Sequence, residues 1–140
     1  MAVEKLEAVY KAAPVVEQVW VYGSSFESAL VAVVAPREKE LRALVAGAAS
    51  AKLPFAELCA LDEARAAVAK ALAEVGRAAK LRGFEIVKAA CLSPEEFSVE
   101  NGLITPTYKF RRAQLLETFR WEVDRMYALV RKESGPLRGL

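Results

Sequence analysis

The residues best suited to chemistry lie in the segment 100–112, ENGLITPTYKFRR, and the central one is Lys109. A lysine ammonium can bind a phosphate or a carboxylate and stabilise charge that develops on a transferring group. That stabilisation is typically worth about 2.7 to 4 kcal/mol in a dry, preorganised site. Proline and β-branched residues make Thr105 to Tyr108 a loop, so we expect Lys109 near the start of the final helix, between apolar anchors. Its chemistry alone also allows a solvated lysine in a basic helix cap.

The chain contains no histidine, which excludes Ser-His-Asp and Cys-His catalysis and His-ligated metals within it. It also lacks a P-loop and a dinucleotide-binding glycine motif. Glu95 and Glu96 are adjacent carboxylates beside a proline, a pattern typical of a solvated turn. Cys59 and Cys91 have no CxxC partner, so we expect two core thiols, a reducing compartment and no metal site.

The composition indicates one folded domain, with 27% charged and 54% apolar residues in 140. Twenty-six alanines make the apolar fraction typical of a helix-rich chain. The net charge of +2 is too balanced for a dedicated nucleic-acid binder. The longest strongly apolar run, residues 29–35, is far shorter than the roughly 20 residues of a transmembrane helix, and we expect no secretion signal.

The pattern of apolar residues predicts the elements that must position Lys109. Helical spacing opens the chain until Pro14, and two β-branched runs then predict an antiparallel hairpin whose second strand is covered on both faces. Asp62 is the expected N-cap of a long helix, and Asn101-Gly102 is the expected turn of a second hairpin. The predicted helices are 3–13, 38–51, 62–82 and one from just after Lys109 to about 134, and the predicted strands are 15–22, 29–35 and 84–92. This order predicts an α+β fold with a small antiparallel or mixed sheet and packed helices.

Two segments carry a resemblance to a known family. Residues 19–34, VWVYGSSFESALVAVV, and 97–109, FSVENGLITPTYK, resemble the C-terminal small domain, or lid, of eukaryotic long-chain acyl-CoA synthetases, which are adenylate-forming enzymes. Residues 2–6 look like the continuation of a GYVAxE segment of that family. The resemblance runs from residue 2 to about 130, so we expect a lid domain at 1–134 and a flexible tail at 135–140.

The resemblance implies a ligase that joins a fatty acid and ATP into acyl-AMP and pyrophosphate, after which the CoA thiol displaces AMP. Lys109 matches the lid lysine that reaches the carboxylate and the α-phosphate, and Thr105, Pro106 and Thr107 match its presenting loop. ATP, Mg²⁺ and CoA are then needed only by the complete enzyme, with none binding tightly to the isolated chain. The expected partners are a large N-terminal adenylation domain, fatty acyl-AMP and CoA, without nucleic acid or a membrane span. The expected location is the cytoplasm or the cytosolic face of a membrane.

Two departures from the wider family pattern bear on the site. Thr107 and Tyr108 stand where many adenylate-forming enzymes have Ser-Gly, a departure that long-chain synthetases share. Lys80 and Arg82 lie where basic residues of the lid approach the CoA phosphates, but Gly83 to Glu85 replaces the usual Tyr-Pro-Arg-like wording there. The family's hinge residue would lie upstream of Met1, and we expect no acyl-CoA formation by the isolated chain.

Two other hypotheses remain open from the sequence. The first is a non-catalytic α+β interaction module that keeps the lid fold and docks a partner through the Ala29 to Ala35 strand or a face of the final helix. The second is nucleic-acid binding through a local group of cations, namely Lys109, Arg111, Arg112, Arg120 and Arg125.

Overall fold

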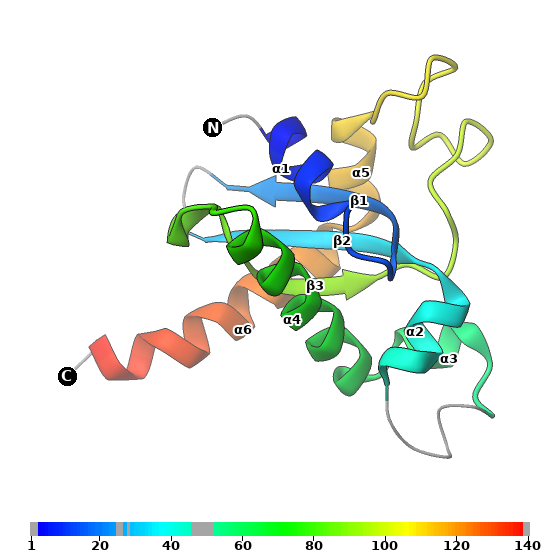
Figure 1. Ribbon diagram of the computed structural model, residues 1–140. Coiled ribbons are helices and arrows are strands. Elements are labelled where there is room, and N and C mark those ends of the chain that lie inside the picture. Colours follow the sequence, from blue (N-terminus) through cyan, green and yellow to red (C-terminus); the bar gives the residue numbers. More distant parts are fainter. Residues whose placement is uncertain (1–2, 25–26, 28, 46–51, 139–140) are drawn as a thin grey trace.

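The computed structural model describes residues 3–24, 27, 29–45 and 52–138 of the chain (Figure 1). Its elements, in chain order, are α1 (Val3–Tyr10), β1 (Val16–Gly23), β2 (Leu30–Pro36), α2 (Glu38–Leu44), α3 (Phe55–Cys59), α4 (Asp62–Ala78), the 3₁₀ helix η1 (Gly83–Glu85), β3 (Val87–Leu92), α5 (Arg112–Thr118) and α6 (Arg120–Arg138). The α+β class predicted from the sequence is confirmed.

The strands form one mixed sheet with the order β1-β2-β3. β1 and β2 pair antiparallel, with Trp20 opposite Val33, so the predicted hairpin is confirmed. β3 returns parallel to β2 after the crossover through α2, α3 and α4, with Ala90 beside Ala32. β2 is therefore the central strand and is buried along its whole length, which leaves it no surface for docking a partner. The strand version of the interaction-module hypothesis is wrong for this reason.

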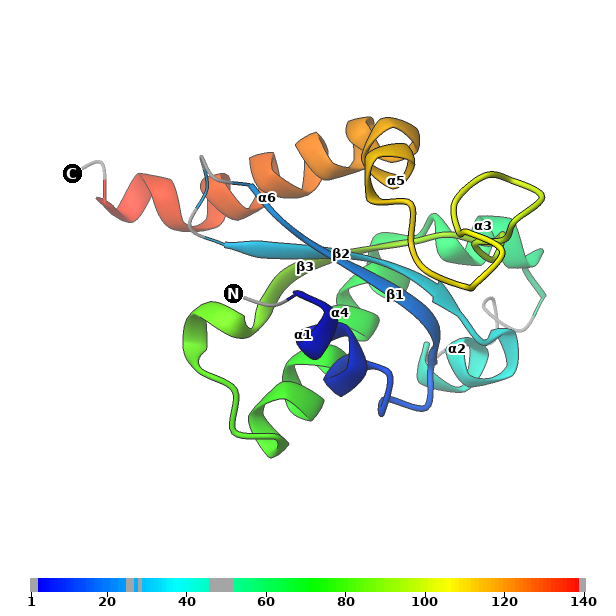
Figure 2. The same ribbon diagram turned by 90° about the horizontal axis from the view of Figure 1, so that it is seen from above.

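Helices cover both faces of the sheet, and Figure 2 shows α1 and α4 on one side and α5 and α6 on the other. Alternation along the strands feeds two core clusters. The first core cluster, under α1 and α4, includes Leu6, Tyr10, Val19, Val21, Ala32, Val34, Val68 and Leu72. The second core cluster, under α5 and α6, includes Trp20, Val31, Val33, Phe97, Ile104, Leu115, Val123 and Tyr127. The two faces of β1 thus belong to different clusters, and the segment after β3 enters the second one.

Several helix boundaries differ from the prediction. The N-cap of α4 is Leu61, which makes no side-chain capping bond, and Asp62 is the first helical residue instead. The Asp62 carboxylate accepts a hydrogen bond from Arg65 in the first turn, so it is used by an ion pair and not by the cap. The helix predicted over 38–51 ends at Leu44, and residues 46–51 lie outside the described part of the chain. The short α3 was not predicted.

The final helix is divided into α5 and α6 at Phe119. Phe119 takes a non-helical backbone conformation, and its ring lies 5.9 Å from Phe97 and 6.4 Å from Trp20. Burial of this ring in the second core cluster accounts for the break in the chain direction. α6 continues to Arg138, past Gly135 and Pro136, where the sequence predicted fraying. A proline removes only one backbone hydrogen bond, which a helix near its end tolerates.

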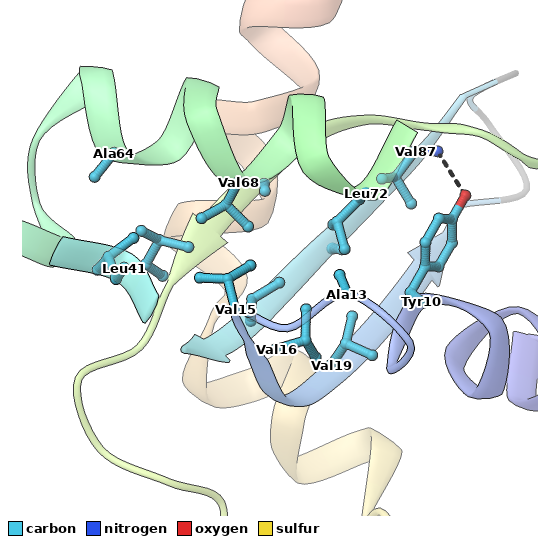
Figure 3. Close-up of a cluster of buried hydrophobic side chains, with 14 of the residues drawn as sticks. Tyr10, Ala13, Val15, Val16, Val19, Leu41, Ala64, Val68, Leu72 and Val87 are labelled. Atoms are coloured by element: carbon cyan, nitrogen blue, oxygen red, sulfur yellow. Dashed lines mark hydrogen bonds between the residues drawn. The ribbon is translucent and has the colours of Figure 1, made fainter. Parts of the chain in front are cut away.

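The Tyr10 hydroxyl links α1 to the start of β3, and its loss is expected to destabilise the chain. The hydroxyl donates to the Glu85 carbonyl at 2.6 Å and accepts from the Val87 N–H at 3.1 Å (Figure 3). Burial raises the pKa of Tyr10, so the hydroxyl stays protonated. Tyr10→Phe leaves two backbone groups without this partner and is expected to cost about 1 to 3 kcal/mol of unfolding free energy. Urea denaturation measures the loss.

Tyr22→Phe is the matched control, because the Tyr22 hydroxyl makes no hydrogen bond within the described residues. Its expected cost is under about 0.5 kcal/mol. Equal costs for the two variants would contradict a structural role for the Tyr10 hydroxyl.

Candidate functional site

The loop that leaves β3 reaches the candidate lysine through a turn at Asn101 and Gly102. Gly102 has φ +80°, a conformation that favours glycine. The Asn101 side chain accepts hydrogen bonds from the N–H groups of Ser98 at 2.9 Å and Leu103 at 3.2 Å, and donates to the Glu96 carbonyl at 2.8 Å. These bonds close the turn on itself, and the residues on its two sides form no paired strands. The predicted hairpin at Asn101-Gly102 is therefore wrong, although the turn exists.

A second, tighter loop lies a few residues further along the chain, around Lys109. Ile104 and Phe110 form a single antiparallel bridge, and the Arg111 N–H donates to the Leu103 carbonyl at 2.9 Å. The Thr105 N–H donates to the Lys109 carbonyl at 2.8 Å. The side chain of Ile104 lies in the second core cluster, and that of Phe110 packs against it. This burial decides where the segments before and after the tip of the loop, its two arms, meet.

The tip between these arms holds the four residues that the sequence analysis assigned to the site. The Thr105 hydroxyl accepts from the Lys109 N–H at 3.1 Å and lies 3.0 Å from the Thr107 hydroxyl. Pro106 forms part of the turn, and Tyr108 closes it with φ +65°. The structure therefore brings Thr105, Pro106 and Thr107 together with the backbone of Lys109. We name residues 104–110 the lysine loop.

The Lys109 side chain is exposed, and its ammonium has no ion-pair or hydrogen-bond partner among the described residues. The backbone on both sides of it is held, whereas the charged group is free to meet an anion. An exposed ammonium on a held backbone can bind a phosphate or a carboxylate.

Two polar anchors that the sequence analysis missed hold the lysine loop on the sheet. The Gln18 amide of β1 donates to the Phe97 carbonyl at 2.9 Å and accepts from the Phe97 N–H at 2.7 Å. Phe97 in turn packs edge-on against Phe110, with ring centroids 5.7 Å apart. The second anchor is Glu7 of α1, which binds Arg112 at the start of α5.

The segment with Lys80 and Arg82 precedes β3, and the chain leaves the other end of β3 toward the lysine loop (Figures 1 and 2). Both side chains are exposed, and Lys80 has φ +63° in the turn that ends α4. The Arg82 guanidinium lies 6.0 Å from the centre of the Phe84 ring, itself exposed. β3, a six-residue strand about 20 Å long, lies between this segment and the lysine loop, so these cations and Lys109 do not form one site.

The other cations and carboxylates proposed from the sequence are differently placed. Arg112 is paired with Glu7, and Arg125 lies 3.7 Å from Asp62 and over the Trp121 ring. Arg111 donates to the Gly102 carbonyl at 3.2 Å. Most members of the proposed nucleic-acid patch are thus engaged within the chain. Glu95 and Glu96 are both exposed, as expected for a solvated turn.

Cys59 and Cys91 are free thiols that line a groove of about 700 Å³ between α4, β3 and α6. Burial raises the pKa of each thiol from 9.0 to about 11. In the described part of the chain, no group of three or more Cys, Asp or Glu side chains could hold a metal ion. Nor does any described helix have the length and apolarity needed to cross a bilayer.

These raised pKa values predict slow alkylation of both cysteines. Two pKa units lower the thiolate fraction about 100-fold, so at pH 8 iodoacetamide is expected to react about 100-fold more slowly with the folded chain than with the urea-unfolded chain. Mass spectrometry of each cysteine measures the alkylation rates. Alkylation of the folded chain at the unfolded rate would contradict the burial of these thiols.

The same pKa values bear on stability. Because the pKa is higher in the folded chain, the thiols' contribution to stability is complete below pH 9 and is lost between pH 9 and about 11.

The fold matches a segment of adenylating enzymes. The A-PCP didomain of carboxylic acid reductase from Segniliparus rugosus, solved in complex with AMP, matches 99% of this chain and 17% of its own length, with a TM-score of 0.77 and 28% identity. No family model matches the sequence.

Two plant sequences narrow the comparison. A probable CoA ligase of Humulus lupulus is 42% identical over 128 residues, 90% of this chain and 19% of that protein. Peroxisomal long chain acyl-CoA synthetase 6 of Arabidopsis thaliana is 42% identical over 135 residues, 96% of this chain and 19% of that protein. The chain is thus homologous to about a fifth of the length of long-chain acyl-CoA synthetases, within the adenylate-forming superfamily, as its sequence predicted.

Proposed function

We propose that this chain is the C-terminal catalytic lid of a long-chain fatty acid–CoA ligase and that Lys109 is its adenylation lysine. The observation that carries the proposal is the Lys109 ammonium, which has no partner among the described residues and stands on a loop pinned at both ends. Homology to long-chain synthetases over nearly the whole chain supports it.

In the first half-reaction, a carboxylate oxygen of the fatty acid attacks the α-phosphorus of ATP, and the bond to the bridging oxygen breaks as pyrophosphate leaves. Both reacting groups are anionic, and an ammonium between them lowers their repulsion and stabilises the charge of the transition state. Lys109 would supply that ammonium, with Thr105, Pro106 and Thr107 holding its backbone. Mg²⁺ would accompany ATP in the complete enzyme.

In the second half-reaction, the CoA sulfur attacks the acyl carbon and AMP leaves. Lys80 and Arg82 are exposed cations at the far end of β3, and we assign them to the phosphates of CoA. Their separation from Lys109 is compatible with a lid that presents different surfaces in the two steps.

The test is a fusion enzyme in which this chain replaces the homologous segment of the Arabidopsis synthetase 6, to which it is 42% identical. With palmitate and ATP, the fusion enzyme is expected to release pyrophosphate and, with CoA, to form palmitoyl-CoA. The isolated 140-residue chain is expected to form neither product. A folded fusion enzyme without adenylation, beside an active parent enzyme, would contradict the proposal.

A further inference from the structure

Glu7 is the most deeply buried acidic side chain described, and it binds groups from two other elements. Glu7 as a whole is only 7% exposed. One carboxylate oxygen accepts from the Val21 N–H at 2.8 Å and from Arg112 at 2.9 Å, and the other accepts from Arg112 at 2.8 Å. β1 is an edge strand, so the Val21 N–H has no strand partner on that side and the carboxylate satisfies it. Glu7 thus joins α1 and β1 to the first residue of α5.

Arg112 stands three residues after Lys109, at the point where the lysine loop becomes a helix. Its two parallel hydrogen bonds to Glu7 fix the orientation of the guanidinium, because the planar groups match. These bonds also raise the pKa of Arg112. The guanidinium lies 5.6 Å from the centre of the Phe110 ring. The Glu7–Arg112 pair, which we call the clamp, therefore also contacts the residue next to Lys109.

We propose that Glu7 is a positioning residue for Lys109. Through Arg112 and Phe110 it holds the C-terminal arm of the lysine loop at a fixed place on the sheet, while Gln18 holds the opposite side through Phe97. This inference rests on the proposed role of Lys109. It adds that α1, the first described helix, belongs to the machinery that directs a lysine about a hundred residues later.

The positioning role predicts a specific kinetic effect for Glu7→Gln. Glutamine keeps an oxygen for the Val21 N–H but turns an amide donor, or an uncharged oxygen, toward the Arg112 guanidinium. The clamp then loosens and the backbone of Lys109 gains freedom. A displacement of about 1 Å from a reacting geometry can cost 100-fold in rate, so the adenylation kcat is expected to fall about 10-fold to 100-fold. The KM values for ATP and palmitate are expected to change less than about threefold, because Glu7 touches neither substrate.

The experiment has two arms, each with Glu7→Gln, Arg112→Lys and the control Glu17→Gln. Glu17 also pairs with an arginine, Arg37, at 3.0 Å, but both side chains are exposed. Arm one measures amide hydrogen exchange in the 140-residue chain, where faster exchange is expected in residues 104–112 and unchanged exchange in β2. Arm two measures kcat and KM in the fusion enzyme. Arg112→Lys keeps a positive charge opposite the Glu7 carboxylate but cannot make the two parallel hydrogen bonds. It therefore tests the clamp even where Glu7→Gln folds poorly.

The outcomes separate the two proposals. Unchanged exchange in the lysine loop, or a lowered stability with an unchanged adenylation kcat, overturns the positioning role and leaves the function of Lys109 standing. An inactive wild-type fusion enzyme beside an active parent overturns the proposed function. Faster loop exchange together with a kcat loss that Glu17→Gln does not share supports the positioning role.

Discussion

Replacing Lys109 with alanine is expected to lower acyl-adenylate formation by the fusion enzyme about 100-fold to 1,000-fold. The loss corresponds to the roughly 2.7 to 4 kcal/mol by which a preorganised charge or donor stabilises a transition state. The fold is expected to survive, because the side chain is exposed and makes no contact with another described charge. Pyrophosphate release at saturating palmitate and ATP measures the rate, and thermal unfolding of the isolated variant checks the fold.

Two comparisons sharpen this expectation. Lys39→Ala removes an exposed lysine from α2, on an element that is not part of the lysine loop, and is expected to leave the rate unchanged. Palmitoyl-CoA formation from supplied palmitoyl-AMP is expected to lose much less than adenylation in Lys109→Ala, since the second step is assigned to Lys80 and Arg82. A folded Lys109→Ala enzyme with an unchanged adenylation rate would refute the assigned role.

Replacing Arg112 with alanine is expected to cost about 3 to 4 kcal/mol of unfolding free energy at pH 7. The substitution leaves the Glu7 carboxylate buried with only the Val21 N–H as a partner. Removing one member of a buried pair is costly because an uncompensated charge remains. Urea denaturation of the 140-residue chain measures the loss.

A double variant identifies the cause of the Arg112→Ala effect. Combining Arg112→Ala with Glu7→Gln removes the stranded charge and is expected to recover part of the loss. Arg111→Ala, at the neighbouring exposed arginine, is expected to cost under about 1 kcal/mol. A cost of Arg112→Ala that equals that of Arg111→Ala would contradict the clamp.

The sequence predicted the elements whose signals are local. β-branched and aromatic residues in two short runs marked β1 and β2, because such side chains suit a pleated, buried strand. Apolar residues at intervals of three and four marked α4, for which the N-cap and the predicted end at residue 82 were wrong, since the helix ends at Ala78. The loop nature of Thr105 to Tyr108 followed from proline and β-branching. The spacing of apolar residues could not predict the break between α5 and α6. The break depends on the contacts of the Phe119 ring with Phe97 and Trp20, which are distant in the chain.

Some features of the fold and of the candidate site could likewise be predicted from the sequence, and others could not. The sequence by itself determined the α+β class, the β1–β2 hairpin and the candidate lysine after a stiff loop, since each depends on residues close together in the chain. Only the tertiary structure decided that β3 runs parallel to β2, that β3 separates Lys80 and Arg82 from the lysine loop, and that Glu7 binds Arg112 across 105 residues. Such contacts are set by how whole elements pack and by which buried polar groups need partners, and no local period of the sequence encodes either.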